Sequence, residues 1–174
     1  VYSIFTDAVS LGLYDYLLKS GSKGFTLSLS GGADSAACGI LVKTMEKLAE
    51  KELGENIFAN LGIYKKTLLV TIYQETKNNS PLTKESAKQI AAELKSIHHE
   101  IGIDSQVEIV TKIIEGITKE KLSWEKQDLA LQNIQARIRS PIVWMLANVN
   151  NHLLLSTGNR SEASAGYTTM DGDS

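Results

Sequence analysis

Cysteine is nearly absent from this sequence: Cys38 is the only one in 174 residues, so no disulfide can form within the chain. Such usage fits a reducing compartment, and we expect a cytoplasmic protein. Long apolar runs are also missing, since no stretch reaches the roughly 18 apolar residues that a membrane span needs. Residues 1–7 lack the basic-then-apolar order of a signal peptide. These absences argue against a membrane protein.

An excess of charge of one sign is missing too. The formal net charge is −2 and charged residues make up 22%, so there is no electrostatic case for a nucleic-acid or membrane partner. Hydrophobic residues make up 43%, which suffices for a packed core. The length suits one domain, and we expect a single domain over residues 1–174. Because the chain starts at Val1 and stops in a polar run at Ser174, we expect both ends to be cut from a longer chain.

Strands and helices are predicted to alternate along the chain. The apolar pattern predicts strands at 25–29, 67–73, 105–110 and 153–156. Helices are expected at 3–20, 34–53, 83–101, 111–121 and 125–151, and Pro141 must kink or restart the last one. This alternation favours an α/β three-layer sandwich with a mainly parallel sheet. Ligands of such folds bind beyond the carboxyl ends of the strands.

The loop after the first predicted strand has the composition of a phosphate-binding turn. It consists of Ser-Gly-Gly-Ala-Asp-Ser at residues 30–35, followed by a predicted helix. Gly31 and Gly32 let the backbone turn and approach a ligand closely. The amides of the turn and the helix N-terminus attract an anion, and Ser30 and Ser35 add hydroxyl groups. The pattern therefore predicts a cradle for phosphate groups.

Asp34 is the unusual residue of this loop. A carboxylate in a phosphate cradle repels the ligand unless a cation lies between them, so we expect Mg²⁺ with Asp34 as one of its few protein ligands. The loop is neither the common mononucleotide loop, because no lysine follows a second glycine, nor the dinucleotide pattern Gly-x-Gly-x-x-Gly. A plain turn with Asp34 as a helix N-cap is the alternative interpretation, which the strand–turn–helix context disfavours.

Ser-Gly-Gly-x-Asp-Ser resembles the motif of the N-type ATP pyrophosphatases, or PP-loop enzymes. Two later segments are similar to NAD synthetase: Asn-Ile-Gln-Ala-Arg-Ile-Arg at 133–139, and Ser-Thr-Gly-Asn-Arg-Ser-Glu at 156–162 with the residues that follow to 173. The resemblance implies a Rossmann-like (adenine nucleotide α-hydrolase-like) fold. It also implies a ligase that amidates deamido-NAD to NAD through an adenylate, with release of AMP and pyrophosphate.

The resemblance assigns roles to single residues. The residues that would bind ATP are Ser30, Gly31, Gly32, Asp34, Ser35 and Thr157. The catalytic and Mg²⁺-binding residues would be Asp34 and Glu162, and the deamido-NAD contacts would be Arg137, Glu162 and Asp173. In the loop at 74–81, Thr76 and Ser80 are candidates for nucleotide contacts. On sequence pattern alone, Arg137 and Arg139 also fit a solvated helix face, and Glu162 fits a helix cap.

Two departures indicate a subtype. Gly-Asn-Arg-Ser at 158–161 stands where many ammonia-dependent bacterial members have Asp-His-Ala-Ala, and Met170 stands where they have a lysine that contacts deamido-NAD. These residues resemble the glutamine-dependent NAD synthetases, in which a separate amidase domain delivers ammonia from glutamine. No amidase domain fits in this chain. The resemblance therefore implies a synthetase domain that is incomplete at its C-terminus and that turns over slowly or not at all by itself.

Two other hypotheses stay open on the sequence alone. Another PP-loop enzyme, of the GMP synthetase or tRNA-modifying type, would share the loop at 30–35, although the tRNA type calls for a basic face or reactive cysteines. A noncatalytic nucleotide-binding fragment is the other. We also expect a homodimer or higher homo-oligomer, and a helical apolar stripe is interpreted as core or as a dimer surface: Ile134, Ile138, Ile142, Met145 and Val149.

Overall fold

A single parallel sheet forms the centre of the molecule in a computed structural model, which describes residues 2–166. The strands are β1 (Phe25–Ser28), β2 (Leu69–Glu75), β3 (Ile97–Gly102) and β4 (Leu153–Leu155). They lie in the order β3-β2-β1-β4, and every pairing is parallel. The expected parallel sheet is therefore confirmed. Met170 and Asp173 lie outside the described residues.

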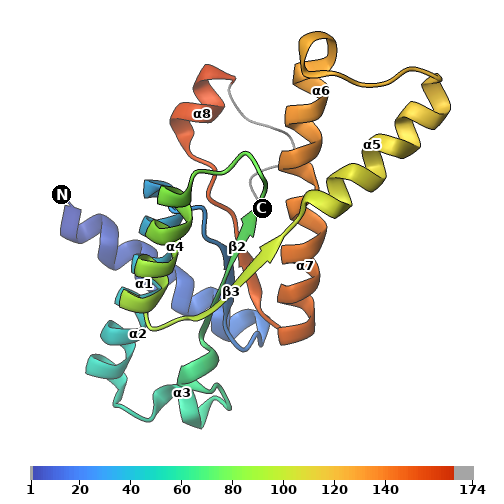
Figure 1. The fold of residues 1–174 in the computed structure, drawn as a ribbon. Coiled ribbons are helices and arrows are strands. Elements are labelled where there is room, and N and C mark those ends of the chain that lie inside the picture. The colour runs from blue at the N-terminus through green and yellow to red at the C-terminus, as the bar shows by residue number, and fades with distance from the viewer. Residues whose placement is uncertain (1, 167–174) are drawn as a thin grey trace.

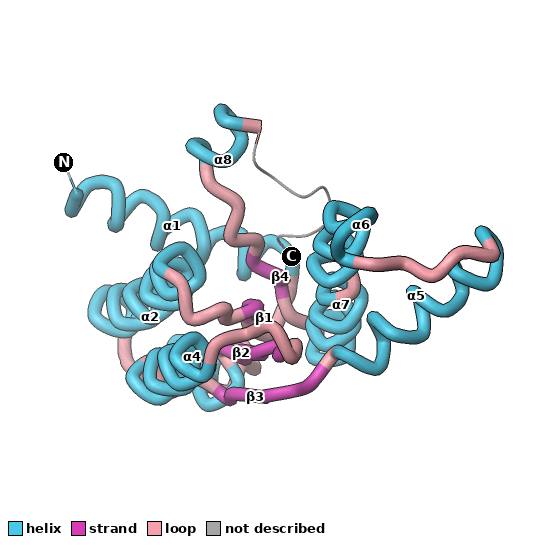
Figure 2. The backbone as a smooth tube through the Cα atoms, turned by 45° about the horizontal axis from the view of Figure 1, so that its top comes forward, coloured by secondary structure: helices cyan, strands magenta, loops and turns pink. Residues whose placement is uncertain are grey.

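Helices cover both faces of this sheet (Figures 1 and 2). On one face lie α2 (Ala33–Leu53) and α4 (Pro81–Glu93), with α1 (Tyr2–Ser20) packed on α2. On the other lies α7 (Arg139–Asn150), next to α6 (Trp124–Arg137), while α5 (Asp104–Thr118) extends away from the sheet. The short elements are α3 (Ile57–Asn60), η1 (Lys65–Thr67) and α8 (Arg160–Ala165). Within the described part of the chain, no helix is both long and apolar enough to cross a membrane. The predicted helix–sheet–helix sandwich is confirmed.

The core lies between the sheet and α2. Phe25 and Leu27 of β1 are completely buried, as are Val42 of α2 and Leu29 just beyond β1. Burial of each such side chain contributes about 1.5–3 kcal/mol. The two central strands are therefore held firmly, and with them the start of the loop that follows β1.

The connections create a switch point between β1 and β4. The chain passes from β1 to β2 and from β2 to β3 over the face that carries α2 and α4, whereas it passes from β3 to β4 through α5, α6 and α7. Loops that leave neighbouring strands toward opposite faces open a crevice beyond the carboxyl ends of those strands. The segments 29–32 and 156–159 lie at this crevice.

The prediction of a strand at 105–110 is wrong, because α5 occupies these residues. The third strand lies at Ile97–Gly102, which the apolar pattern predicts as the end of a helix. That helix, α4, ends at Glu93, and Lys95 then adopts φ +50. Glycine usually occupies such a left-handed position. Because Lys95 stands there instead, the sequence gives no signal that the helix ends. Because β3 is a half-exposed edge strand, its pattern is also not a clean alternation.

Other boundaries differ by a few residues. β2 runs two residues further than predicted, so Gln74 and Glu75 belong to the strand and not to the loop after it. The N-cap of α4 is Ser80, whose Oγ accepts a hydrogen bond from the Thr83 amide at 3.3 Å, and not Thr83 itself. The predicted restart near Pro141 is confirmed, since α6 ends and α7 begins just before it.

Two histidines join neighbouring strands. His152, just before β4, is 8% exposed and its Nδ1 lies 3.2 Å from the Thr26 hydroxyl of β1. His98 of β3 has its Nδ1 2.9 Å from the Thr71 hydroxyl of β2. Burial lowers the pKa of both imidazoles. The fold therefore favours the neutral form of each ring.

We predict that the free energy of unfolding decreases as the pH falls below about 6.5, the ordinary pKa of histidine. The unfolded chain then binds protons that the folded His152 and His98 resist. His152→Gln can still bond to Thr26 but cannot titrate, so the decrease between pH 7 and pH 5 becomes shallower. Urea unfolding at a series of pH values measures this slope. The exposed His99→Gln is the matched control, and an equal slope in His152→Gln and the unaltered protein would contradict the prediction.

Candidate functional site

A pocket of about 380 Å³ lies at the carboxyl edge of the sheet, where the loops after β1, β2 and β4 meet. It brings together most of the site residues that the sequence predicts: Ser30, Gly32, Asp34, Ser35, Thr157 and Glu162. These residues come from two segments more than 120 positions apart, a separation that the parallel pairing of β1 with β4 closes. The pocket thus coincides with the switch point of the sheet.

The loop after β1 is shaped by its own hydroxyl groups. The hydroxyls of Ser30 and Ser35 lie 3.1 Å apart, and that of Ser35 donates to the carbonyl of Gly32 at 3.1 Å. The amide of Gly32 donates to Ser30 Oγ at 3.2 Å. Gly32 is the N-cap of α2 and no side chain caps this helix, so the alternative interpretation of Asp34 as the N-cap is wrong. The uncapped first turn presents amide groups that favour an anion.

Gly31 packs directly on the first turn of α4. Its φ is +83, and a Cβ at this position would lie 2.4 Å from the carbonyl oxygen of Thr83. Ser86 of α4 donates its hydroxyl to the Gly31 carbonyl at 3.1 Å. Only glycine combines this backbone conformation with this close approach. Gly31 therefore positions the loop, although it does not line the pocket itself.

Asn159 joins the two predicted acidic residues of the site. Its Nδ2 donates to Asp34 Oδ2 at 3.3 Å, which links the loop after β4 to the loop after β1. Its amide donates to Glu162 Oε2 at 3.1 Å, and its Oδ1 accepts from the Glu162 amide at 2.9 Å. This pair forms a capping box at the start of α8. Glu162 therefore caps α8, as the alternative interpretation predicts, and it also lines the pocket.

The two arginines of the segment 133–139 lie in different places. Arg139 lines the same pocket as Asp34 and donates from Nη1 to the carbonyl of Gln135 at 2.9 Å. Burial lowers the pKa of its guanidinium group, and none of the described carboxylates forms an ion pair with it. The predicted Arg137 is exposed and lines a separate, largely apolar pocket between α5 and α6. Sequence reasoning missed Arg139 because the break between α6 and α7 falls between the two arginines, and the two side chains line different pockets.

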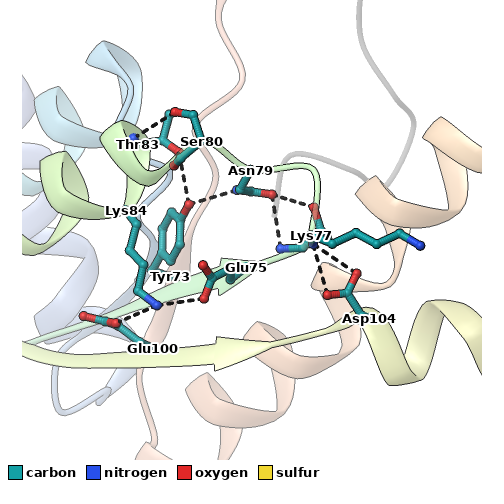
Figure 3. A network of polar contacts seen from close by, with 10 residues as sticks. Tyr73, Glu75, Lys77, Asn79, Ser80, Thr83, Lys84, Glu100 and Asp104 are labelled. Atoms are coloured by element: carbon teal, nitrogen blue, oxygen red, sulfur yellow. Dashed lines mark hydrogen bonds and ion pairs between the residues drawn. The ribbon is translucent and has the colours of Figure 1, made fainter.

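The loop after β2 is rigid, and its pocket residues differ from the predicted ones (Figure 3). The hydroxyl of Tyr73 lies 3.1 Å from that of Thr83 and accepts from Asn79 Nδ2 at 2.9 Å. The buried Thr76 donates to Asn79 Oδ1 at 2.6 Å, and Ser80 caps α4, so both predicted candidates have structural roles here. The residues of this region that line the pocket are Tyr73, Gln74 and Asn79.

An ion-pair cluster beside this loop fixes α4 to the sheet. Lys84 of α4 lies 2.8 Å from Glu75 of β2 and 3.4 Å from Glu100 of β3 (Figure 3). The backbone amide of Lys77 also donates to the carboxylate of Asp104, at 3.0 Å to Oδ2. The β2 side of the pocket is therefore linked to α4, β3 and α5 by these contacts.

Cys38 is close to the site without the properties of a nucleophile. Its sulfur lies 4.0 Å from the carbonyl oxygen of Ser156. Burial raises the pKa of the thiol, and the carboxylate of Asp34 raises it further. Because the thiolate is the reactive form, this cysteine is held in an unreactive state.

A parallel α/β sheet with the Ser-Gly-Gly-Ala-Asp-Ser loop at its switch point, faced by Glu162 from the segment after β4, is typical of a nucleotide-binding fold of the PP-loop class. Comparison with protein families identifies which one. The model described as NAD synthase matches residues 5–174. The chain belongs to the NAD synthase family.

Relatives agree with this assignment. A crystal structure of a glutamine-dependent NAD(+) synthetase from Cytophaga hutchinsonii matches with a TM-score of 0.90 and 43% identity, over 97% of this chain and 33% of that one. The glutamine-dependent NAD(+) synthetase of Oryza sativa subsp. indica is 34% identical over 92% of this chain. The enzyme from Acinetobacter baumannii, solved in complex with ADP, matches with a TM-score of 0.72 and 27% identity, over 97% of this chain and 28% of that one. The chain spans 26% of the length of the rice protein.

We predict that Gly31→Ala destabilises the fold by about 2 kcal/mol or more, since alanine resists a positive φ and its Cβ would displace the carbonyl of Thr83. Gly32→Ala is the matched control: its φ is −88 and the added Cβ would meet only Ser30 Oγ, at 3.3 Å. Urea unfolding measures both. Equal costs for the two substitutions would show that Gly31 does not position the loop.

Proposed function

We propose that this chain is a ligase that amidates deamido-NAD to NAD at the expense of ATP. The observation that carries the proposal is the meeting of the phosphate loop with Asp34, Glu162 and Arg139 in one pocket at the switch point of the sheet. The relatives, which are glutamine-dependent NAD(+) synthetases, support it. They favour this ligase over another PP-loop enzyme or a noncatalytic nucleotide-binding fragment.

The reaction proceeds in two displacements. A carboxylate oxygen of deamido-NAD attacks the α-phosphorus of ATP, the bond to the β-phosphate oxygen breaks, and pyrophosphate leaves. Ammonia then attacks the acyl carbon of the adenylate, the acyl–oxygen bond breaks, AMP leaves, and the nitrogen loses a proton. The first step brings two anions together, so its barrier depends on the positive groups around them.

Each group in the pocket has a task in these steps. The amides of the turn and of the first turn of α2 hold the β- and γ-phosphates, with the hydroxyls of Ser30 and Ser35 beside them. Thr157 contacts the α-phosphate or the adenylate from the opposite loop. Arg139, desolvated in the wall of the pocket, neutralises the charge that develops as the carboxylate approaches. Enclosure by the surrounding loops keeps water from the adenylate.

Asp34 and Glu162 are suited to hold Mg²⁺. Within the described residues no group of three or more His, Cys, Asp or Glu side chains could bind a metal ion. Mg²⁺ is commonly held by one or two carboxylates together with substrate phosphates and water, and this pocket offers two carboxylates that Asn159 keeps in place. When bound, Mg²⁺ would neutralise the phosphate oxygens and keep Asp34 from repelling them.

Deamido-NAD is larger than this pocket, and its remote half calls for contacts elsewhere. We propose Arg137, on the neighbouring pocket of α5 and α6, and Asp173, outside the described residues, as such contacts. We also propose that the chain is the single ATP-pyrophosphatase domain of a cytoplasmic, glutamine-dependent enzyme. An amidase domain in the same protein would then supply ammonia.

A homodimer is the proposed assembly. Several large apolar side chains are exposed on α5 and α7: Ile109, Ile113, Ile117, Trp144, Met145 and Val149. Of the apolar stripe that the sequence predicts as core or dimer surface, Ile134, Ile138 and Ile142 are half-buried, whereas Met145 and Val149 are 70% and 78% exposed. Large apolar side chains that stay exposed in this way are candidates for a contact between proteins.

Asp34→Asn is predicted to lower deamido-NAD-dependent AMP formation at least about 100-fold, because it removes a charge that the metal site needs. The folded state should persist, since asparagine has the shape of aspartate. The measurement is AMP release from ATP with deamido-NAD, Mg²⁺ and ammonium. Asp15→Asn, an exposed aspartate of α1, is the control. AMP formation by Asp34→Asn within a few-fold of that by the unaltered protein would contradict the assigned role. Binding of ATP without binding of deamido-NAD by the unaltered protein would contradict the proposed function.

Substitutions of the two arginines should change different steady-state kinetic parameters. Arg139→Gln is predicted to lower kcat about 100-fold or more, because its guanidinium acts on the reacting groups. Arg137→Gln is predicted chiefly to raise KM for deamido-NAD, because it contacts the remote half of the substrate. Initial rates at varied deamido-NAD concentration give both values. The reverse assignment, with Arg137→Gln affecting kcat more, would place the reacting carboxylate in the pocket of α5 and α6.

A further inference from the structure

Gln74 is the one described residue of the pocket whose buried side-chain polar atoms all lack a hydrogen-bond partner. It lies near the end of β2 and is 3% exposed, and neither its Oε1 nor its Nε2 has a partner in the described protein. A buried amide without a partner costs free energy, and such groups in folded proteins usually await a ligand or water. The proposed reaction leaves this residue without a role.

The alternation of β2 directs Gln74 to the α7 side of the pocket. Tyr73 points toward α4, where its hydroxyl meets Thr83. Successive side chains of a strand point to opposite faces, so Gln74 points to the face that α7 covers (Figure 2). Ser28 and Arg139 line the pocket with it. Gln74 therefore lines the same pocket as the phosphate loop, one strand pairing away from it.

The chemistry of an amide selects among the parts of a nucleotide. A phosphate group has only acceptors and would leave Oε1 unpaired. A purine edge offers a donor beside an acceptor, and the amide of glutamine matches the 6-amino group of adenine and the neighbouring ring nitrogen with two hydrogen bonds. Leu29 and Tyr73 line the pocket nearby and provide uncharged surroundings for a base.

We propose that Gln74 is a specificity-determining residue that recognises the adenine base of the bound nucleotide. The inference rests on the proposed function only in that the loop at 30–35 holds the phosphates of ATP. Oε1 accepts from the 6-amino group, and Nε2 donates to N1 or N7 of the ring. No protein group holds the amide in one orientation, so the base itself sets it.

Binding of ATP and of purine riboside triphosphate, which lacks the 6-amino group, tests this inference. The unaltered protein is expected to bind ATP about 10-fold more tightly than the analogue. Gln74→Leu is expected to bind ATP about 30-fold more weakly, for two lost hydrogen bonds, and to bind the two nucleotides equally. Gln74→Glu keeps an acceptor for the 6-amino group but loses the donor to the ring nitrogen, and it is expected to bind ATP more weakly than the unaltered protein does. Isothermal titration calorimetry with Mg²⁺ gives the affinities.

Controls separate a role in recognition from a role in folding. Gln89→Leu, at an exposed glutamine of α4, is the matched substitution and should leave ATP affinity unchanged. Inorganic tripolyphosphate should bind equally to Gln74→Leu and to the unaltered protein. The melting temperature of ligand-free Gln74→Leu should equal or exceed that of the unaltered protein, because an unpaired amide is replaced by an apolar group of similar size.

Three results would overturn the inference. An unchanged preference for ATP over purine riboside triphosphate in Gln74→Leu would show that the base is recognised elsewhere. Loss of the preference for ATP over 2′-deoxy-ATP, with the base preference kept, would assign Gln74 to the ribose. A lower melting temperature with unchanged ATP affinity would make the residue purely structural. If the unaltered protein bound neither ATP nor tripolyphosphate, the proposed function would fail first, and this inference with it.

Discussion

The parallel pairing of β1 with β2 and with β4 is the interaction on which the site depends. It brings the carboxyl ends of three strands to one edge, and with them segments far apart in the sequence. The amide of Leu29 continues this pairing beyond β1 by donating to the Ile72 carbonyl at 2.9 Å. The phosphate loop therefore starts from a fixed position one residue later. Because the start of the loop is fixed, the hydrogen bonds among Ser30, Gly32 and Ser35 can give the loop a defined shape.

Charge in this pocket is balanced by partners from different loops. Asp34 stands at a helix N-terminus, where a carboxylate is favoured, yet it faces the place where phosphates bind. Asn159 restrains it from the loop after β4, and Arg139 adds a positive group from α7. No single loop could combine the amides of the turn after β1, the carboxylate of Asp34 and the guanidinium of Arg139. The proposed adenylation of a carboxylate would use all three within one cavity.

Much of this architecture is predictable from local sequence. β1, the loop after it and α2 follow from the apolar run before Ser30, the two glycines and the helical pattern after them. The positions of the polar loops indicate which edge of the sheet holds the site. The missing parts have physical causes. β3 is a half-exposed edge strand, and Lys95 replaces the glycine that would mark the end of α4. Arg139, Gln74 and Asn159 reach the pocket through the register of strands and the direction of a helix, which tertiary packing decides.

The transfer of oxygen from substrate to AMP tests the central claim most directly. Deamido-NAD labelled with ¹⁸O in its carboxylate would be incubated with ATP, Mg²⁺ and ammonium, and the AMP analysed by mass spectrometry. Attack of the carboxylate on the α-phosphorus, followed by ammonia at the acyl carbon, leaves one labelled oxygen in AMP and one in the amide of NAD. Formation of NAD with unlabelled AMP, or with the label in pyrophosphate, would contradict an adenylate formed in this pocket.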